Sequence, residues 1–244
     1  MLVIRDLKKI YKGTTKGITG VSLHMEKGDV YAFIGHNGAG KTTLLKAITG
    51  IHDFDQGEVF INGVDLKKAP LEAKKNFAYV PDNPDVYEFM TGIQYLNFIA
   101  DVYGVSAADR ESRIALHAER FEITASLGNL ISSYSHGMKQ KLVLISAFLH
   151  DPRLLIMDEP FVGLDPKAAF LLKESMRELT TRGGAIFFST HVLDVAEKLC
   201  NKVAIVREGQ IIADGLMQDV LKDGVSLEDL FMETVTSGPS GSSK

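Results

Sequence analysis

The chain has 244 residues, 45% of them hydrophobic, and a formal net charge of −4. This length allows a sizeable core, and the slightly acidic balance gives no indication of a nucleic-acid-binding surface. The single cysteine, Cys200, excludes an internal disulfide framework.

The apolar runs of the sequence are too short to cross a membrane. The longest, such as residues 142–149, fall well below the roughly 20 residues that a membrane-spanning helix needs. No charged-then-apolar leader precedes the first predicted strand. We therefore expect a cytoplasmic protein, which would need a separate membrane chain to take part in a membrane process.

Two kinds of strand pattern occur along the chain. Short alternating runs with turn residues between them predict a small N-terminal antiparallel sheet, at residues 2–7, 20–25 and 57–63. Continuous apolar runs predict strands buried on both faces, at residues 30–34, 77–80, 154–158, 185–189 and 203–206. Helical stretches lie between these strands, notably 41–48 and 166–182. This alternation predicts an α/β core with a mostly parallel sheet.

Residues 85–150 differ from the rest, because helical spacing continues there without a strand run. We expect a helical subdomain inserted into the α/β core, which then comprises residues 1–84 and 151–232 of a single domain, 1–232. The end of the chain is rich in Gly and Ser, so we expect residues 233–244 to be a disordered tail. That tail could be native or a cloning remnant.

Residues 35–43 read GHNGAGKTT and fit the pattern G-x-x-x-x-G-K-[ST]. Average residue usage would produce this pattern by chance in roughly one chain in a hundred of this size. An apolar strand precedes the match and a helix follows it, as the motif requires. The alternative is a Gly-rich turn before an ordinary helix.

The motif predicts a phosphate site. Its glycines let backbone N–H groups turn toward phosphate oxygens. Lys41 would reach the β- and γ-phosphates, and the Thr42 hydroxyl would ligate Mg²⁺. The predicted nucleotide-binding residues are Gly35, His36, Asn37, Gly38, Ala39, Gly40, Lys41, Thr42 and Thr43, of which His36 and Asn37 need no side-chain function.

The predicted strand 154–158 ends in Asp158, and Glu159 follows at once. Asp158 would hold Mg²⁺ through water, and Glu159 would orient a water molecule against the γ-phosphate. Acids at a strand end are common in turns, so the pair is weak evidence alone. Beside the phosphate motif it becomes strong, and the two together predict ATP and Mg²⁺ as ligands.

Residues 134–141 read YSHGMKQK, a Ser-x-Gly turn before a helix, which is typical of an anion site at a helix N-terminus. The stretch resembles the signature sequence of ABC ATPases, whose common form is Leu-Ser-Gly-Gly-Gln. Ser135 and Gly137 match that form, whereas His136 replaces its first glycine and Met138 its glutamine. In isolation the stretch could equally be a Ser-capped helix start.

Other resemblances to ABC ATPases, a class of P-loop NTPases, follow in family order. FVGLDP at 161–166 resembles the D-loop, and STH at 189–191 resembles the switch histidine, His191. Tyr11 lies where the family places an aromatic residue that stacks on adenine. The resemblance covers residues 1–232 and implies that Lys41, Glu159 and His191 are catalytic.

The same resemblance implies that two ATPase domains pair head to tail. In that arrangement Ser135 and the start of its helix meet the γ-phosphate held by the other domain. The second anion site would then serve the ATP that the partner binds.

The segment after the strand 77–80 departs from the family pattern. The family has a glutamine there that contacts Mg²⁺, whereas this chain has Asp82. Aspartate is shorter by one methylene group and carries a charge. Asp82 could therefore ligate Mg²⁺ through water, or it could belong to a Pro-Asp-Asn-Pro turn without a metal role.

Residues 79–104 resemble the Ecs-type and related exporter ATPases of bacteria. The family places the coupling helix of the membrane subunit near Asp85, Tyr87 and Glu88. Tyr87 and Phe89 could be exposed apolar anchors for that helix. They could equally be buried under the helical subdomain.

The resemblance implies the ATP-hydrolysing subunit of an ABC transporter, peripheral on the cytosolic face of the membrane. Its partners would be a transmembrane permease and a second ATPase subunit, identical or related, with export the favoured direction and no nucleic acid involved. A soluble ABC ATPase acting on nucleic acid or ribosomes is the alternative, but this chain has one motif set and no long heptad run. A small-molecule kinase would leave the signature, the D-loop and the switch histidine unexplained.

Overall fold

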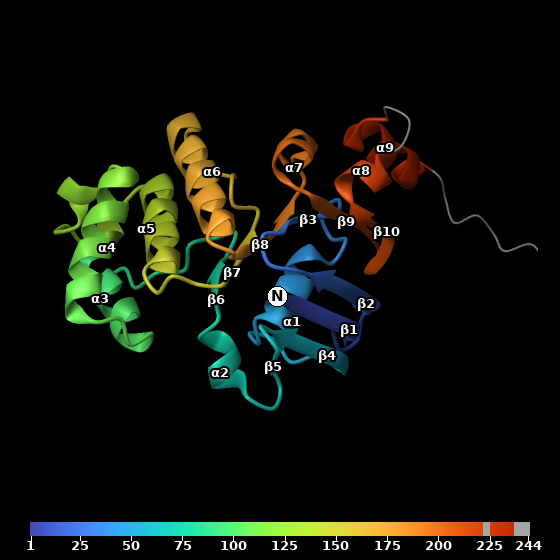
Figure 1. Ribbon diagram of the computed structural model, residues 1–244, viewed down its shortest axis with the longest axis horizontal. Helices are drawn as coiled ribbons and strands as arrows, with labels where there is room; N and C mark the ends of the chain where they lie inside the picture. The colour runs from blue at the N-terminus through green and yellow to red at the C-terminus, as the bar shows by residue number, and fades with distance from the viewer. Residues whose placement is uncertain (222–224, 237–244) are drawn as a thin grey trace, which may run out of the picture.

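The computed structural model describes residues 1–221 and 225–236, which form two sheets with helices packed around them (Figure 1). The smaller sheet is antiparallel, with strand order β2-β1-β4-β5. It consists of β1 (Leu2–Ile10), β2 (Gly17–Met25), β4 (Gln56–Ile61) and β5 (Val64–Asp65). The predicted N-terminal antiparallel sheet is thereby confirmed.

The larger sheet has six strands in the order β10-β9-β3-β8-β7-β6. Its strands from β9 to β6 run parallel, and β10 pairs antiparallel with β9 at the edge. They are β3 (Val30–Ile34), β6 (Phe77–Val80), β7 (Leu154–Asp158), β8 (Ala185–Thr190), β9 (Lys202–Arg207) and β10 (Gln210–Leu216). The five continuous apolar runs of the sequence are the five parallel strands, so the predicted α/β class is confirmed.

These runs are apolar throughout because the larger sheet has a hydrophobic core on each face. Phe33 and Phe187 point to one core, to which α1 (Lys41–Ile48) and the antiparallel sheet also contribute side chains. Their neighbours Ile34 and Phe188 point to the other core, which helices that follow β6 in the chain cover. Successive residues of a strand face opposite sides, so both sides of each parallel strand must be apolar.

Three helices lie between β6 and β7 in the chain and gather at one end of the molecule, beside α6 in Figure 1. They are α3 (Gly92–Val102), α4 (Ala107–Arg120) and α5 (His136–Phe148), with the short turns η1 (Thr124–Ser126) and η2 (Ile131–Ser133) between the last two. Each of the three helices begins after a Thr or Ser whose side chain accepts a backbone hydrogen bond, at Thr91, Ser106 and Ser135. These caps explain why the helices begin where they do.

The remaining helices lie beside the larger sheet or form the end of the described chain. They are α2 (Pro70–Lys74), α6 (Pro166–Thr181), α7 (Leu193–Leu199), α8 (Met217–Val220) and α9 (Leu227–Thr236). Within the described ranges, no helix is both long and apolar enough to span a membrane.

The end of α9 corrects one expectation. Residues 233–236 are helical, where the sequence predicts the start of a disordered tail. They contain neither Gly nor Pro, so they continue the helix that begins at Leu227. The Gly/Ser-rich residues 237–244 lie outside the described residues.

Candidate functional site

The larger sheet brings the sequence motifs together at one edge. Because β3, β6, β7 and β8 are parallel, their carboxyl ends lie side by side. The phosphate motif follows β3, Asp82 follows β6, Asp158 ends β7, and His191 follows β8. Ligands of open α/β sheets bind outside the carboxyl ends of the strands. The topology therefore places motifs that are far apart in the chain around one site.

The loop of residues 35–40 leads from β3 into α1 through backbone that only glycine adopts easily. Gly40 has φ 107°, and a Cβ atom there would lie 2.9 Å from the carbonyl oxygen of Gly17. Gly40 is also the N-cap of α1, and no side chain caps this helix. The first N–H groups of α1 therefore have no side-chain acceptor, which suits an anion.

A cavity of about 290 Å³ opens over this loop. It is lined by Tyr11, Lys16, Gly17, His36, Asn37, Gly38, Gly40, Lys41, Thr42, Thr43, Asp82 and Glu159. Most of the predicted nucleotide-binding residues thus share one cavity with two predicted catalytic residues. Gly35 and Ala39 do not line it, but the carbonyl of Gly35 accepts a hydrogen bond from Lys41 Nζ at 2.7 Å.

The three predicted catalytic side chains form a line of contacts. Lys41 Nζ lies 3.3 Å from Glu159 Oε1, and His191 Nδ1 lies 2.9 Å from Glu159 Oε2. The side chains of Lys41 and Glu159 are only 7% and 15% exposed, so water screens their attraction less than at the surface. His191 does not line the cavity itself and reaches it through Glu159.

Glu159 has a left-handed backbone, with φ 48°. Its N–H donates to the carbonyl oxygen of Ser189 at 3.2 Å and to Ser189 Oγ at 3.1 Å. A non-glycine residue in this region is strained, and such strain persists only where surrounding contacts hold it. β8 therefore holds Glu159 at the edge of the cavity.

Asp158 is fully buried, and Ser189 Oγ donates to its Oδ1 atom. Burial raises the pKa of Asp158, and the charges of Asp82 and Glu159 add to this, against the hydrogen bond from Ser189. Its Oδ2 atom has no hydrogen-bond partner among the described residues. A buried carboxylate with an unpaired oxygen is a suitable neighbour for a cation.

These donors fit Mg²⁺. Thr42 and Asp82 both line the cavity, so a hydroxyl and a second carboxylate are available beside it. Over residues 1–221 and 225–236, no three or more His, Cys, Asp or Glu side chains form a cage for a metal. Mg²⁺ typically binds one or two carboxylates together with substrate phosphates and water, so it needs no such cage.

Asp82 keeps both of its possible roles. It faces the cavity, as a metal ligand would, and its Oδ1 also accepts a hydrogen bond from the N–H of Asn83 at 2.8 Å. That bond is the kind that stabilises a turn.

Tyr11 lies at the rim of the cavity with 38% of its surface exposed. Its hydroxyl is 3.5 Å from Thr43 Oγ1, and its ring meets His52 edge-on. An exposed ring at the rim is suitable for stacking on a nucleotide base.

Three residues of the site were not expected from the sequence. Lys16 and Gly17 line the cavity, but the turn-rich stretch KGTTKG that contains them gave no signal. Ser189 holds both Asp158 and Glu159. Its signal was available, since it is a polar residue near the end of the otherwise apolar strand AIFFST.

Ser135 and Gly137 do not line this cavity. Ser135 is exposed at the start of α5, where its Oγ accepts a hydrogen bond from the N–H of Met138 at 3.3 Å. Gly137 lies near the carbonyl oxygen of Gly163 instead. The predicted second anion site is therefore separate from the first within one chain.

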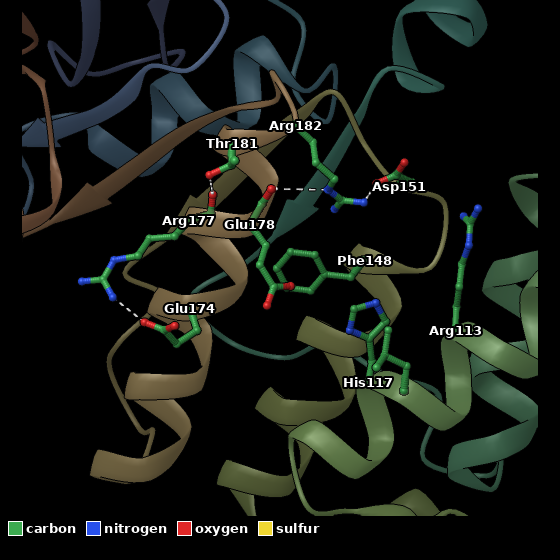
Figure 2. Close-up of a pocket in the computed structure, with 10 residues that line it drawn as sticks. Arg113, His117, Phe148, Asp151, Glu174, Arg177, Glu178, Thr181 and Arg182 are labelled. Carbon is green, nitrogen blue, oxygen red and sulfur yellow. Dashed lines mark hydrogen bonds and ion pairs between the residues drawn. The ribbon is translucent and has the colours of Figure 1, made fainter.

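A larger cavity of about 520 Å³ lies between α4 and α6 and contains none of the predicted site residues (Figure 2). Four of its charged groups pair with each other, Arg182 with Asp151 at 3.1 Å and Arg177 with Glu174. The smaller cavity over the glycine loop has uncapped helical N–H groups and the paired side chains that the sequence predicts to be catalytic. The smaller cavity is therefore the candidate nucleotide site.

The surface before α3 carries an aromatic group. Tyr87 and Phe89 are 47% and 76% exposed, and their ring centroids are 5.8 Å apart. Phe98 adds a third ring at 5.7 Å from Tyr87. Of the two alternatives left by the sequence, the structure shows the exposed one.

The mostly parallel sheet and its glycine loop define a P-loop nucleotide-binding protein. Residues 18–162 match the family model described as ABC transporter, and the chain belongs to this family. The predicted recognition and fold are therefore confirmed.

Individual proteins that are similar to this chain have names that place them in the same family. The ABC-type transporter ATP-binding protein EcsA of Bacillus subtilis (strain 168) is 34% identical over 238 residues, which cover 96% of each chain. The Nod factor export ATP-binding protein I of Rhizobium etli is 31% identical over 223 residues, covering 91% of this chain and 70% of that one. A solved structure of the ATP-binding subunit of an ABC transporter is similar with a TM-score of 0.92 at 36% identity, covering 96% of this chain and 99% of the other.

Proposed function

We propose that this chain hydrolyses ATP and that two such subunits pair around ATP to drive a separate membrane subunit. The observation that carries the proposal is the contact line of Lys41, Glu159 and His191 beside the glycine loop. A phosphate-binding lysine and a carboxylate held by a histidine are the groups that ATP hydrolysis needs.

Each residue has a role in this chemistry. The ammonium group of Lys41 and the N–H groups at the start of α1 bind phosphate oxygens. Glu159, released from Lys41 by the phosphate, orients the attacking water and receives its proton, while His191 holds the carboxylate in place. Bound Mg²⁺, held by Thr42, Asp158 and Asp82, would neutralise charge on the β- and γ-phosphates. Catalysis is then mainly positioning and charge stabilisation.

The exposed start of α5 supports the pairing of subunits. Ser135, Gly137 and the helix N-terminus form an anion site that lies outside the chain's own nucleotide cavity. In a symmetric pair, each subunit would complete the site of the other. The second ATPase subunit is either a copy of this chain or a close relative.

The membrane partner would bind the exposed aromatic group of Tyr87, Phe89 and Phe98. In this proposal residues 85–150 act as the helical signature subdomain, and residues 1–84 and 151–232 act as the catalytic core of one domain, 1–232. The protein would lie on the cytosolic face of the membrane, and similarity to the Nod factor export ATP-binding protein favours export. A net charge of −4 does not favour the alternative of a soluble ABC ATPase acting on nucleic acid.

The test of hydrolysis is Glu159→Gln. We expect nucleotide binding to persist, because Lys41 and the glycine loop remain, and phosphate release to fall by roughly 100-fold or more. Glu208→Gln is a matched control, since Glu208 has the same φ of 48° but lies outside the cavity. If Glu159→Gln released phosphate at the wild-type rate, the catalytic assignment would be wrong.

A further inference from the structure

His136 occupies an unusual place at the start of α5. It is the first residue of the helix, directly after Ser135, and it replaces a glycine of the signature pattern. Its ring lies against Gly163, where an added Cβ atom would be 3.0 Å from His136 Cδ2 and 3.1 Å from Nε2. Gly163 belongs to the loop of residues 159–165, which begins at Glu159.

α5 contacts this loop at two points: His136 lies against Gly163, and Lys141 Nζ lies 3.0 Å from Asp165 Oδ2. Within the loop, the N–H of Val162 donates a hydrogen bond to the carbonyl of Glu159 at 3.1 Å. The other oxygen of Asp165 accepts from the N–H of Ala168 at 2.8 Å and caps α6. With Asp165 fixed by Lys141 and α6, the contact at Gly163 sets the middle of the loop.

His136 also faces a second segment that leaves the nucleotide cavity. A cavity of about 400 Å³ lies between α5 and the segment of residues 83–88, and His136 forms part of its wall. Lys139, three residues later on α5, pairs across it with Glu88. This segment follows Asp82 directly. His136 therefore lies between the loop that begins at Glu159 and the segment that begins after Asp82.

We infer that His136 is a positioning residue that couples the signature helix of this chain to its own Glu159. The inference rests on the proposed function and goes beyond it. An ATP molecule bound to Ser135 by the partner subunit would shift the first turn of α5, and the imidazole ring would pass that shift to Gly163. A glycine at position 136 has no side chain to do so. The contact should affect the chemical step more than ATP binding, because Lys41 and the glycine loop are untouched.

The first test is steady-state ATP hydrolysis by the full chain with His136→Gly. We expect kcat to fall roughly 10-fold, which is less than the roughly 100-fold loss that a 1 Å misplacement of a catalytic group can cause. KM for ATP should stay within about twofold of the wild-type value. His136→Phe keeps a planar ring against Gly163 and should restore most of kcat. An unchanged kcat, or a rise in KM alone, would overturn the inference.

The second test is a double-mutant cycle with Gly163→Ala. Its φ of 79° strains alanine whether or not His136 is present, so that cost cancels in the cycle. The clash with the ring exists only when His136 is present. We therefore expect Gly163→Ala to lower kcat more in the wild type than in His136→Gly. Equal losses in the two backgrounds would contradict the inference and leave the Glu159→Gln result, which tests the proposed function, unaffected.

Discussion

Glu159 is the proposed catalytic carboxylate, and its position is set by three neighbours. Lys41 and His191 contact its carboxylate, while Ser189 accepts its backbone N–H. Its left-handed backbone costs on the order of 1 kcal/mol or more, which the surrounding structure must offset. The motif pair of lysine and acid is visible in the sequence, and Ser189 is visible as a polar residue near the end of an apolar strand, but the strained backbone of Glu159 and its contact with Ser189 are not. Both depend on β7 and β8 being neighbours.

Asp82→Ala distinguishes the two roles of that residue. If Asp82 helps to hold Mg²⁺, the variant should need roughly 10-fold more Mg²⁺ for half-maximal hydrolysis, as expected when a supporting ligand is lost. A titration of phosphate release against Mg²⁺ measures this, with Asp53→Ala as a control because Asp53 is exposed and outside the cavity. An Asp82→Ala curve that overlies the wild type would leave Asp82 as a turn residue only.

The helices between β6 and β7 are tied to α6 by ionic contacts. Arg120 of α4 makes two bonds to Glu178, at 2.7 and 2.9 Å, and a third to Ser175 at 3.0 Å. Lys141 of α5 adds the pair with Asp165 at the start of α6. A bidentate Arg–carboxylate pair has a defined geometry, so α4 is held in a fixed orientation on α6. The sequence predicted these helices from their periodicity, but their partners were not predictable, because surface charges pair according to tertiary packing.

Two half-buried histidines, His117 on α4 and His150 just after α5, should make stability depend on pH. Burial lowers the pKa of His117 and of His150 to about 4, and Arg120 adds to the effect at His117. Below pH 6.5 the unfolded chain takes up these protons and the folded chain does not. The free energy of unfolding should therefore fall as pH drops from 6.5 toward 4, by at most about 1.4 kcal/mol per pH unit for each histidine.

Urea unfolding between pH 7 and pH 4.5 measures this effect. His117→Phe keeps a ring beside Phe148, which His117 stacks on in Figure 2, and removes the titrating group. Its unfolding free energy should decline less with falling pH than that of the wild type. The exposed His24 gives the control variant His24→Phe, which should follow the wild type. Equal slopes for His117→Phe and the wild type would contradict the assignment.

For the whole molecule, the sequence was most informative where a pattern has one physical meaning. Continuous apolar runs indicated the parallel strands, and the glycine loop indicated the phosphate site. The edge strand β10 was not predicted, because it is only partly buried and lacks a continuous apolar run. Lys16 was also missed, since it reaches the cavity only through the fold of the antiparallel sheet. The sequence indicated the succession of strands, helices and motifs along the chain, whereas the contacts between distant segments required the structure.

In the proposed pair of subunits, Ser135 of one subunit completes the nucleotide site of the other. Light scattering of Glu159→Gln, with and without ATP and Mg²⁺, measures it most directly, because this variant should bind ATP without consuming it. We predict a doubling of mass that depends on ATP, that is lost when Ser135→Ala is added and that persists when the nearby exposed Ser133 is changed to Ala instead. A chain that binds ATP and remains a monomer would contradict pairing between identical subunits, and a dimer indifferent to Ser135→Ala would contradict the role of that serine.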